Sequence, residues 1–317
     1  MKTKLLYILV GSQADVYTEQ AWVSASSARE RNPSAVIELL ADADTVVPAP
    51  MERLFDRIIR VDFPSETPPM KRSRLLKTGM RGYVSGDFLY IDADTLVVRP
   101  LDGIDGITAP LAACRDLHSP FPEHPHHDAT VNMCRRLGFD ASGVREYFNS
   151  GVMLVRDTPE THAFFERWRW NYLAGWEAGV RPDQPSLAQT NAGDEIALLP
   201  DAWNCEIQNG VRYLRDAFIV HYMVTNVGSG PQEGLFLLNR KDVLMCLRET
   251  GGITEEIRAV MDDHFKGYAP VTQVFAGEDL YLFRTRRYRF LRRGFRRGKW
   301  SFLEFLLKVK DHLSCRK

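Results

Sequence analysis

The N-terminal part of the chain alternates between short apolar runs and segments of helical composition, and this alternation limits the possible folds more than any other feature. The apolar runs lie at residues 4–10, 35–40, 57–61 and 87–91, and the helical segments at residues 17–30 and 71–83. Strands that alternate with helices form parallel sheets with right-handed crossovers and helices on both faces. The sequence therefore predicts an α/β protein with a doubly wound, mostly parallel central sheet.

The first apolar run is too short for a secretory core. It has six consecutive apolar residues, 5–10, before Gly11, whereas a secretory core needs about 7–15. No other window approaches the roughly 20 apolar residues of a membrane span. The five cysteines are scattered without C-x-x-C spacing, which favours a reducing compartment over a disulfide framework. We expect a buried first strand and a cytoplasmic protein.

The C-terminal tail, residues 284–317, is strongly basic although the whole chain is neutral. It holds 13 Lys or Arg and two acids, so its charge is +11 and residues 1–283 carry −11. Aromatic residues interleave with the arginines, and residues 301–308 have an amphipathic pattern. This favours an anionic membrane surface, at the inner face of the membrane, over a solvated tail. No base-reading motif supports nucleic acid. We expect a main domain at 1–235 and a helical or irregular extension at 236–283 before this tail.

Two acidic residues, Asp92 and Asp94, directly follow the apolar run at 87–91. Ligands bind at the carboxyl ends of the strands in open parallel sheets, which places this pair on the same rim as the turn at residues 11–15. Carboxylate oxygens suit Mg²⁺ or Mn²⁺, which keep coordination positions open for phosphate oxygens. The Asp-x-Asp pattern is equally typical of a turn with capping carboxylates, so the pair alone leaves both interpretations open.

Six short segments, in this order, resemble glycosyltransferase family 8, the group of glycogenin and the lipopolysaccharide galactosyl- and glucosyltransferases. They are R-L-L-K at 74–77, F-L-Y-I-D-A-D-T-L-V at 88–97, A-C-R-D at 113–116, Y-F-N-S-G-V-M-L-V at 147–155, D-Q at 183–184 and F-I-V-H-Y at 218–222. The fourth segment is the most specific, because Asn149 and Gly151 interrupt an apolar stretch.

The resemblance implies a GT-A fold with a helical, basic C-terminal extension. It also implies a metal-dependent, retaining transferase that moves a hexose from a nucleotide-sugar, with UDP favoured, to a glycan or lipid-linked acceptor. The implied cofactor is Mn²⁺ or Mg²⁺, and its implied ligands are Asp92, Asp94 and His221. The implied donor-binding residues are Leu9, Gly11, Asp15, Tyr17, Arg74, Asp92 and Asp116. The implied catalytic residues are Asn149, Asp183 and Gln184.

The chain departs from the family just after His221. The family pattern H-x-x-G-x-x-K-P-W has Val224 and Val227 here, in place of its Gly and its phosphate-binding Lys. Arg240 and Lys241 are candidates for the replacement charge.

Two other functions fit parts of the sequence. I-D-A-D-T-L at 91–96 fits the nucleophile loop of haloacid-dehalogenase-type phosphatases, in which Asp92 would be phosphorylated and Asp94 would be the acid and base. That family usually places the loop near the N-terminus and adds a later acidic motif, of which we find no convincing copy. The absence of the family's phosphate-binding Lys is also consistent with a non-catalytic module that binds sugar nucleotides or glycans.

Three remaining features have structural interpretations. Asp42 and Asp44 are expected to end the second strand, with at most one of them near the donor base. Residues 118–128 contain four histidines and three prolines, which predicts a surface loop near the acceptor cleft, with a metal site as the alternative. The aromatic residues of the helix expected at 161–176 are predicted to be core rather than a carbohydrate platform.

Overall fold

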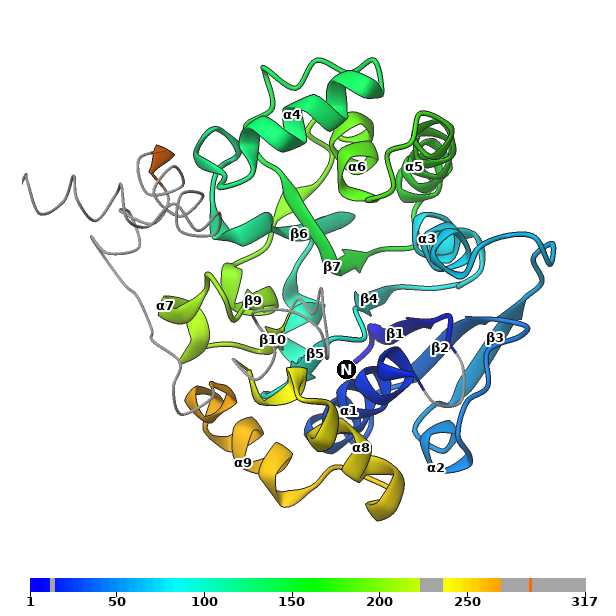
Figure 1. Ribbon diagram of the computed structural model, residues 1–317, viewed down its shortest axis with the longest axis vertical. Coiled ribbons are helices and arrows are strands. Elements are labelled where there is room, and N and C mark those ends of the chain that lie inside the picture. Colours follow the sequence, from blue (N-terminus) through cyan, green and yellow to red (C-terminus); the bar gives the residue numbers. More distant parts are fainter. Residues whose placement is uncertain (12–14, 223–235, 269–284, 287–317) are drawn as a thin grey trace, which may run out of the picture. The chain divides into compact units, whose positions relative to one another are not determined.

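The computed structural model describes residues 1–11, 15–222, 236–268 and 285–286 (Figure 1). The chain divides into two compact units, Met1–Thr272 and Gln273–Lys317. Residues 236–268, the described part of the predicted extension, belong to the first unit. The predicted basic tail lies outside the described residues apart from residues 285–286.

A seven-stranded sheet with the order β3-β2-β1-β4-β7-β6-β8 forms the centre of the first unit. Neighbouring strands are parallel except at β7, which runs antiparallel to β4 and to β6. The strands are β1 (Lys4–Leu9), β2 (Ile37–Asp42), β3 (Arg57–Val61), β4 (Phe88–Ile91), β6 (Leu111–Arg115), β7 (Phe148–Val155) and β8 (Ala197–Leu198). This architecture confirms the mostly parallel α/β fold that the sequence predicts.

Helices cover both faces of this sheet (Figure 1), and alternate residues of β1 point to the two faces. Leu5 and Tyr7 pack in a core with α1, α8 and α9, whereas Leu6 and Ile8 pack in a core with α3 and α5. The helices are α1 (Val16–Arg31), α2 (Ala49–Glu52), α3 (Pro69–Gly79), α4 (His127–Arg136), α5 (Pro159–Glu177), α6 (Gln184–Thr190), α7 (Val211–Leu214), α8 (Lys241–Thr250) and α9 (Glu255–Asp262).

A second, three-stranded sheet brings a distant part of the chain to the end of β4. Its order is β5-β10-β9, and its strands are β5 (Thr95–Val97), β9 (Cys205–Glu206) and β10 (Ile219–His221). β10 runs antiparallel to β5, with His221 opposite Thr95. Because β5 begins directly after Asp94, this register places His221 beside the Asp-Ala-Asp segment.

Residues 118–128 form only in part the surface loop that their composition predicts: Pro122, Glu123, His126 and Asp128 are exposed, whereas His118 and His124 are buried. The segment contributes to short 3-10 turns at Asp116–His118 and Phe121–Glu123 and to the start of α4. His118 and His124 are each only 5% exposed, and the ring of each is hydrogen bonded to a buried partner, as a buried polar group requires. The prediction was wrong for these two histidines, because composition records polar rings and prolines but not partners from other parts of the chain.

Two further expectations concern the described residues. None of the helices there combines the length and the apolar character that crossing a lipid bilayer requires. The four cysteines among them, Cys114, Cys134, Cys205 and Cys246, are unpaired thiols.

Candidate active site

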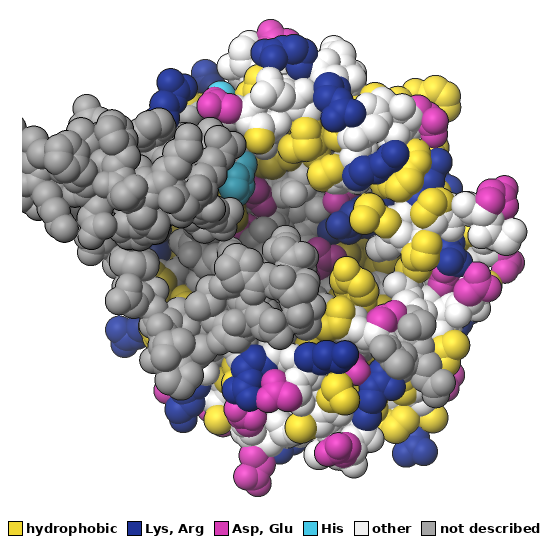
Figure 2. Space-filling model, in the orientation of Figure 1, with side chains coloured by type: hydrophobic (Ala, Val, Ile, Leu, Met, Phe, Trp, Pro, Cys, Tyr) yellow, Lys and Arg dark blue, Asp and Glu magenta, His cyan; other side chains and the backbone are white. Residues whose placement is uncertain are grey.

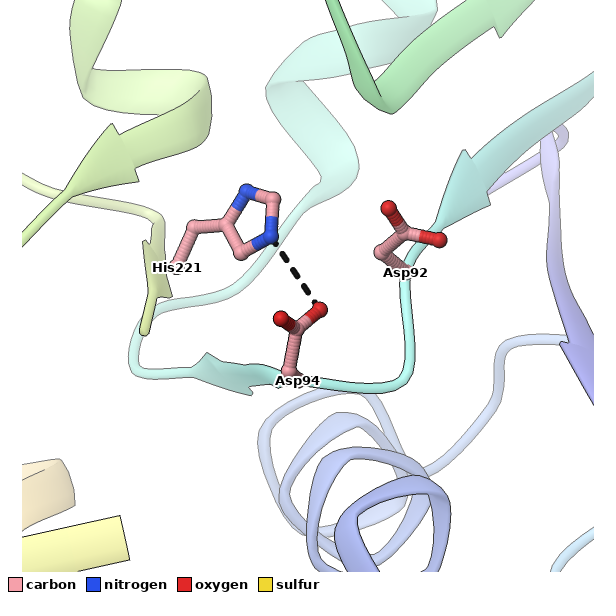
Figure 3. Close-up of side chains that lie close together, drawn as sticks. All are labelled: Asp92, Asp94 and His221. Atoms are coloured by element: carbon pink, nitrogen blue, oxygen red, sulfur yellow. Dashed lines mark hydrogen bonds and ion pairs between the residues drawn. The ribbon is translucent and has the colours of Figure 1, made fainter. Parts of the chain in front are cut away.

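Asp92, Asp94 and His221 converge at the carboxyl end of β4 (Figure 3). Each offers one ligand atom within 4.8 Å of the others, and His221 Nε2 lies 3.1 Å from Asp94 Oδ1. The carboxylates are partly exposed, whereas the imidazole is buried. Burial alone would lower the pKa of His221, but the Asp94 carboxylate raises it above its ordinary value. The three residues therefore form a possible metal site.

Gly151 of β7 leaves the space that this imidazole occupies. Its carbonyl accepts a hydrogen bond from Asp92 N at 2.7 Å. A Cβ at this position would overlap His221 Cε1 and would lie 2.8 Å from Asn149 Oδ1. The close approach of the ring to the backbone explains why a glycine interrupts this buried strand.

Lys77 and Tyr90 hold the Asp92 carboxylate from two sides. Lys77 Nζ is 3.0 Å from Asp92 Oδ2, and the Tyr90 hydroxyl donates to Asp92 Oδ1. Lys77 is 3% exposed, so this ion pair is shielded from solvent. Sequence reasoning assigned no role to Lys77. The signal was its spacing, because it lies three residues after Arg74 and therefore shares a helix face with it.

Asp183 carries its charge among three polar side chains. Arg74 Nε lies 3.2 Å from Asp183 Oδ1, Ser150 Oγ donates to Asp183 Oδ2 at 2.7 Å, and Lys77 Nζ lies 3.8 Å from the same oxygen. Burial alone would raise the pKa of Asp183, but the Lys77 and Arg74 cations outweigh this effect and lower it to about 2. The Asp183 carboxylate in turn raises the pKa of Arg74. The predicted catalytic Asp183 and the predicted donor-binding Arg74 are therefore in direct contact.

The Asp116 carboxylate lies at the centre of a second polar cluster. Its Oδ1 accepts hydrogen bonds from Asn149 Nδ2 at 2.9 Å and from Gln184 Nε2 at 2.7 Å. Its Oδ2 lies 2.8 Å from His124 Nε2. The backbone N–H of His126 donates to His124 Nδ1 at 3.1 Å, so Nε2 carries the proton that is donated to Asp116. The structure thus brings together three predicted site residues, and His124 is a partner that sequence reasoning placed in a surface loop.

The side-chain amide of Gln184 has a defined orientation. Its Nε2 donates to Asp116 Oδ1 and, at 3.3 Å, to the carbonyl of Phe148. Both amide hydrogens are therefore used, and Oε1 is the end of the side chain that can accept a hydrogen bond or face a developing positive charge.

Two residues in left-handed backbone conformation follow Asp116. Leu117 has φ 51° and His118 has φ 52°, a conformation that costs roughly 1–3 kcal/mol at such residues. The buried Glu206 stabilises the turn, since its carboxylate accepts from Leu117 N and its backbone N–H donates to His118 Nε2 at 2.9 Å. Burial raises the pKa of Glu206 well above its ordinary range. The turn places Asp116 at the cluster.

A cavity of about 490 Å³ lies beside the possible metal site, and its lining includes Leu9, Tyr17, Arg74, Asp92 and Asp94. In the space-filling view, acidic and basic side chains lie close together at the centre of the visible face, with hydrophobic side chains near them (Figure 2). Five of the predicted donor-binding or metal-binding residues therefore line one cavity. The 57% exposed ring of Tyr17 is available for stacking.

Other predicted donor-binding residues shape the backbone near this cavity. Asp15 caps α1 by accepting a hydrogen bond from Thr18 N at 2.8 Å, and Gly11 N donates to Thr45 Oγ1 at 3.1 Å. Asp42 ends β2, as expected, and both Asp42 and Asp44 form ion pairs with Arg72.

The candidates for the replacement charge are only partly described. Residues 223–235, which include the positions of the family's Gly and Lys, lie outside the described residues. Arg240 precedes α8 and pairs with Asp242, its Nε lying 3.2 Å from Asp242 Oδ1. Lys241 is the first residue of α8.

Solved glycosyltransferase structures share this fold. The chain superposes on the bifunctional glycosyltransferase WbbM with a TM-score of 0.52 and 11% identity, covering 71% of this chain and 46% of that one. The galactosyltransferase LgtC, solved with donor and acceptor sugar analogs, gives a TM-score of 0.50 and 16% identity, covering 81% of this chain and 99% of that one. The apo form of GlyE from Streptococcus pneumoniae gives a TM-score of 0.50 and 17% identity, covering 86% of this chain and 66% of that one.

These similarities establish the fold. The chain spans about half of WbbM and about two thirds of GlyE. No protein-family model matches the sequence, and no curated protein matches it at the sequence level. The GT-A glycosyltransferase fold predicted from the ordered motifs is confirmed.

Proposed function

We propose that the protein is a metal-dependent, retaining glycosyltransferase that transfers a hexose from a nucleotide-sugar, with UDP-hexoses favoured, to a hydroxyl of a glycan or lipid-linked acceptor. The observation that carries this proposal is the convergence of Asp92, Asp94 and His221 beside a 490 Å³ cavity in a glycosyltransferase fold. The galactosyltransferase LgtC was solved with donor and acceptor sugar analogs, which supports a donor and an acceptor as ligands here.

The chemistry of the three ligands fits Mn²⁺ or Mg²⁺. Two carboxylate oxygens and one imidazole nitrogen form a ligand set that Mn²⁺ accepts readily and that leaves positions for phosphate oxygens. Two cationic side chains, Arg74 and Lys77, already neutralise part of the local negative charge. The bound cation would supply the remaining charge that a diphosphate leaving group requires.

The cavity suits the nucleotide part of the donor. Tyr17 offers an exposed ring for the base at the start of α1, and Asp92 and Asp94 line the same cavity. The sugar would then extend toward Asp183 and Gln184, the two residues that follow each other at the start of α6.

The proposed reaction exchanges two bonds at the anomeric carbon on one face of the sugar. The bond from this carbon to the diphosphate oxygen breaks, the acceptor oxygen forms the new bond, and the acceptor proton moves to the departing diphosphate oxygen. Gln184 Oε1 would face the positive charge that develops at the anomeric carbon, because its amide nitrogen is bound to Asp116. The protein contributes positioning and electrostatic stabilisation.

A donor screen tests this proposal and separates it from its alternatives. We expect slow, Mn²⁺-dependent hydrolysis of one or more nucleotide-hexoses, and faster release of the nucleoside diphosphate, by transfer of the hexose, when an acceptor is added. A phosphatase that uses Asp92 as nucleophile would instead release phosphate from phosphomonoesters. Binding of nucleotide-sugars without turnover in any condition would leave only a non-catalytic module.

We also propose, from the sequence of residues 284–317, that the basic tail holds the protein at an anionic membrane surface, with a cytoplasmic location. Each Lys or Arg near anionic headgroups contributes about 1 kcal/mol. The substitution of Arg292, Arg293, Arg296 and Arg297 by Gln in the full chain should therefore weaken binding to phosphatidylserine vesicles by about a hundredfold or more. Equal sedimentation of both proteins with these vesicles would contradict the proposal.

A further inference from the structure

Asn204 connects the possible metal site to the Asp116 cluster. It ends the 3-10 turn Asp201–Asn204, and its side chain is fully buried. Its Oδ1 lies 3.0 Å from His221 Nδ1, and its Nδ2 donates to Asn149 Oδ1 at 2.9 Å.

The first of these contacts fixes the orientation and the proton of the imidazole. Because Asn204 Nδ2 is used by Asn149, its Oδ1 faces the ring and accepts a hydrogen bond from Nδ1–H of His221. The other ring nitrogen, Nε2, then points to Asp94 and to the position of a metal ion (Figure 3). A partner at the remote ring nitrogen sets which nitrogen can bind a metal.

The second contact, from Asn204 to Asn149, begins a series of side-chain amides that leads to Asp116. Asn149 Oδ1 accepts from Asn204 Nδ2 and from the backbone N–H of Gly151 at 2.8 Å, while Asn149 Nδ2 donates to Asp116 Oδ1. Each amide in this series donates on one side and accepts on the other. Reversal of either amide would therefore place two donors or two acceptors against each other, so His221 and Asp116 are oriented by one continuous series of hydrogen bonds.

We infer that Asn204 is the positioning residue of this site: it presents His221 Nε2 to the metal and couples that imidazole, through Asn149, to the residues that face the sugar. The inference rests on the proposed metal-dependent function. The two ends of the Asn204 side chain have different partners: Oδ1 accepts from the metal ligand His221, and Nδ2 donates to Asn149 of the Asp116 cluster.

Two substitutions separate these parts. Asn204→Leu removes both hydrogen bonds at similar volume. Asn204→Asp keeps an acceptor for His221 Nδ1–H but replaces the donor to Asn149 with a second acceptor. The matched control is Asn32→Leu, because Asn32 is also buried and also loses two hydrogen bonds, Oδ1 to Leu101 N at 2.7 Å and Nδ2 to Ala28 O at 3.1 Å.

The first measurement is Mn²⁺ binding by calorimetry, with the metal alone and no nucleotide. We expect Asn204→Leu to weaken binding by about 10–100-fold, the usual effect of removing a partner of a metal-binding histidine. Asn32→Leu should lower the unfolding temperature while Mn²⁺ affinity stays at the wild-type value. Asn204→Asp should keep Mn²⁺ affinity but lose transferase turnover, because repulsion between its carboxylate and Asn149 Oδ1 misaligns the sugar cluster.

The second measurement is ¹⁵N NMR of the His221 ring in the metal-free protein, at a pH at which the ring is neutral. The wild type and Asn204→Asp should show a protonated Nδ1, and Asn204→Leu a mixture of tautomers. Absence of Mn²⁺ binding in the wild type would remove the proposed metal-dependent function. Metal binding in the wild type with unchanged affinity and tautomer in Asn204→Leu would overturn the inference alone. If the Leu variant does not fold, a tenfold or larger loss of Mn²⁺ affinity in Asn204→Asp overturns it.

Discussion

His221 Nε2 lies 3.1 Å from Asp94 Oδ1 although 127 positions separate the two residues in the chain. The contact follows from the pairing of β10 with β5, in which His221 stands opposite Thr95, the residue after Asp94. Tyr222 N donates to the carbonyl of Asp94 at 2.9 Å and extends this pairing. The backbone ladder therefore fixes the histidine beside the acidic pair.

Asp94→Asn should abolish Mn²⁺-dependent turnover of a nucleotide-hexose while the protein stays folded. An amide oxygen is a neutral and weaker ligand than a carboxylate, and the change also removes the negative charge that His221 faces. The measurement is the hydrolysis rate across Mn²⁺ concentrations, with circular dichroism to confirm the fold. Turnover at the wild-type level would rule out the metal role of Asp94.

Gly151→Ala should displace the imidazole of His221 and weaken Mn²⁺ binding at least tenfold, an effect of about the size seen when a metal-site partner is lost. The added methyl would overlap His221 Cε1 and crowd Asn149 Oδ1. Gly106→Ala is the control, because a Cβ there meets no atom within 4 Å. Equal Mn²⁺ affinity in both variants, measured by calorimetry, would mean that the ring does not need this space.

His124→Leu should lower turnover by about tenfold, because Asp116 would lose one of the three donors that orient it and leave a buried oxygen unpaired. His162→Leu is the control. Its ring also lies 2.8 Å from a carboxylate, that of Asp157, but on the surface and away from the site. Steady-state kinetics of the two variants should differ. A loss of turnover of the same size in both variants would mean that general destabilisation causes the effect.

The ionised Asp183 carboxylate should stabilise the fold at neutral pH, and this stabilisation should be lost in acid. Its pKa falls from 3.8 to about 2 on folding, so the stabilisation is present above the unfolded-state pKa and is lost as the pH falls toward 2. A shift of this size corresponds to about 2 kcal/mol. Urea unfolding of the wild type and Asp183→Asn between about pH 5 and about pH 3 should give curves of stability against pH that converge toward the acid end. Parallel curves would contradict the assignment.

Local patterns in the sequence determined the first strands and helices and the position of the acidic pair. The alternation of apolar runs and helical segments predicted β1, α1, β2, β3 and β4 close to their observed bounds, because periodicity and capping act over a few residues. The position of Asp92 and Asp94 after a buried strand placed them on the ligand-binding rim. The pairing of this site with His221 came from the order of motifs and not from local pattern.

Tertiary structure decided the partners of each polar side chain. Three contacts at the site were not visible in local sequence patterns: Lys77 with Asp92, Asn204 with His221, and His124 with Asp116. The first two join separate segments of the chain, and the third lies in a segment whose composition suggested a surface loop. The physical reason is that a buried polar group is stable only when another polar group, from any part of the chain, satisfies it. Such pairing depends on where the strands and helices pack, so composition placed His124 in a surface loop whereas the fold made it a buried donor.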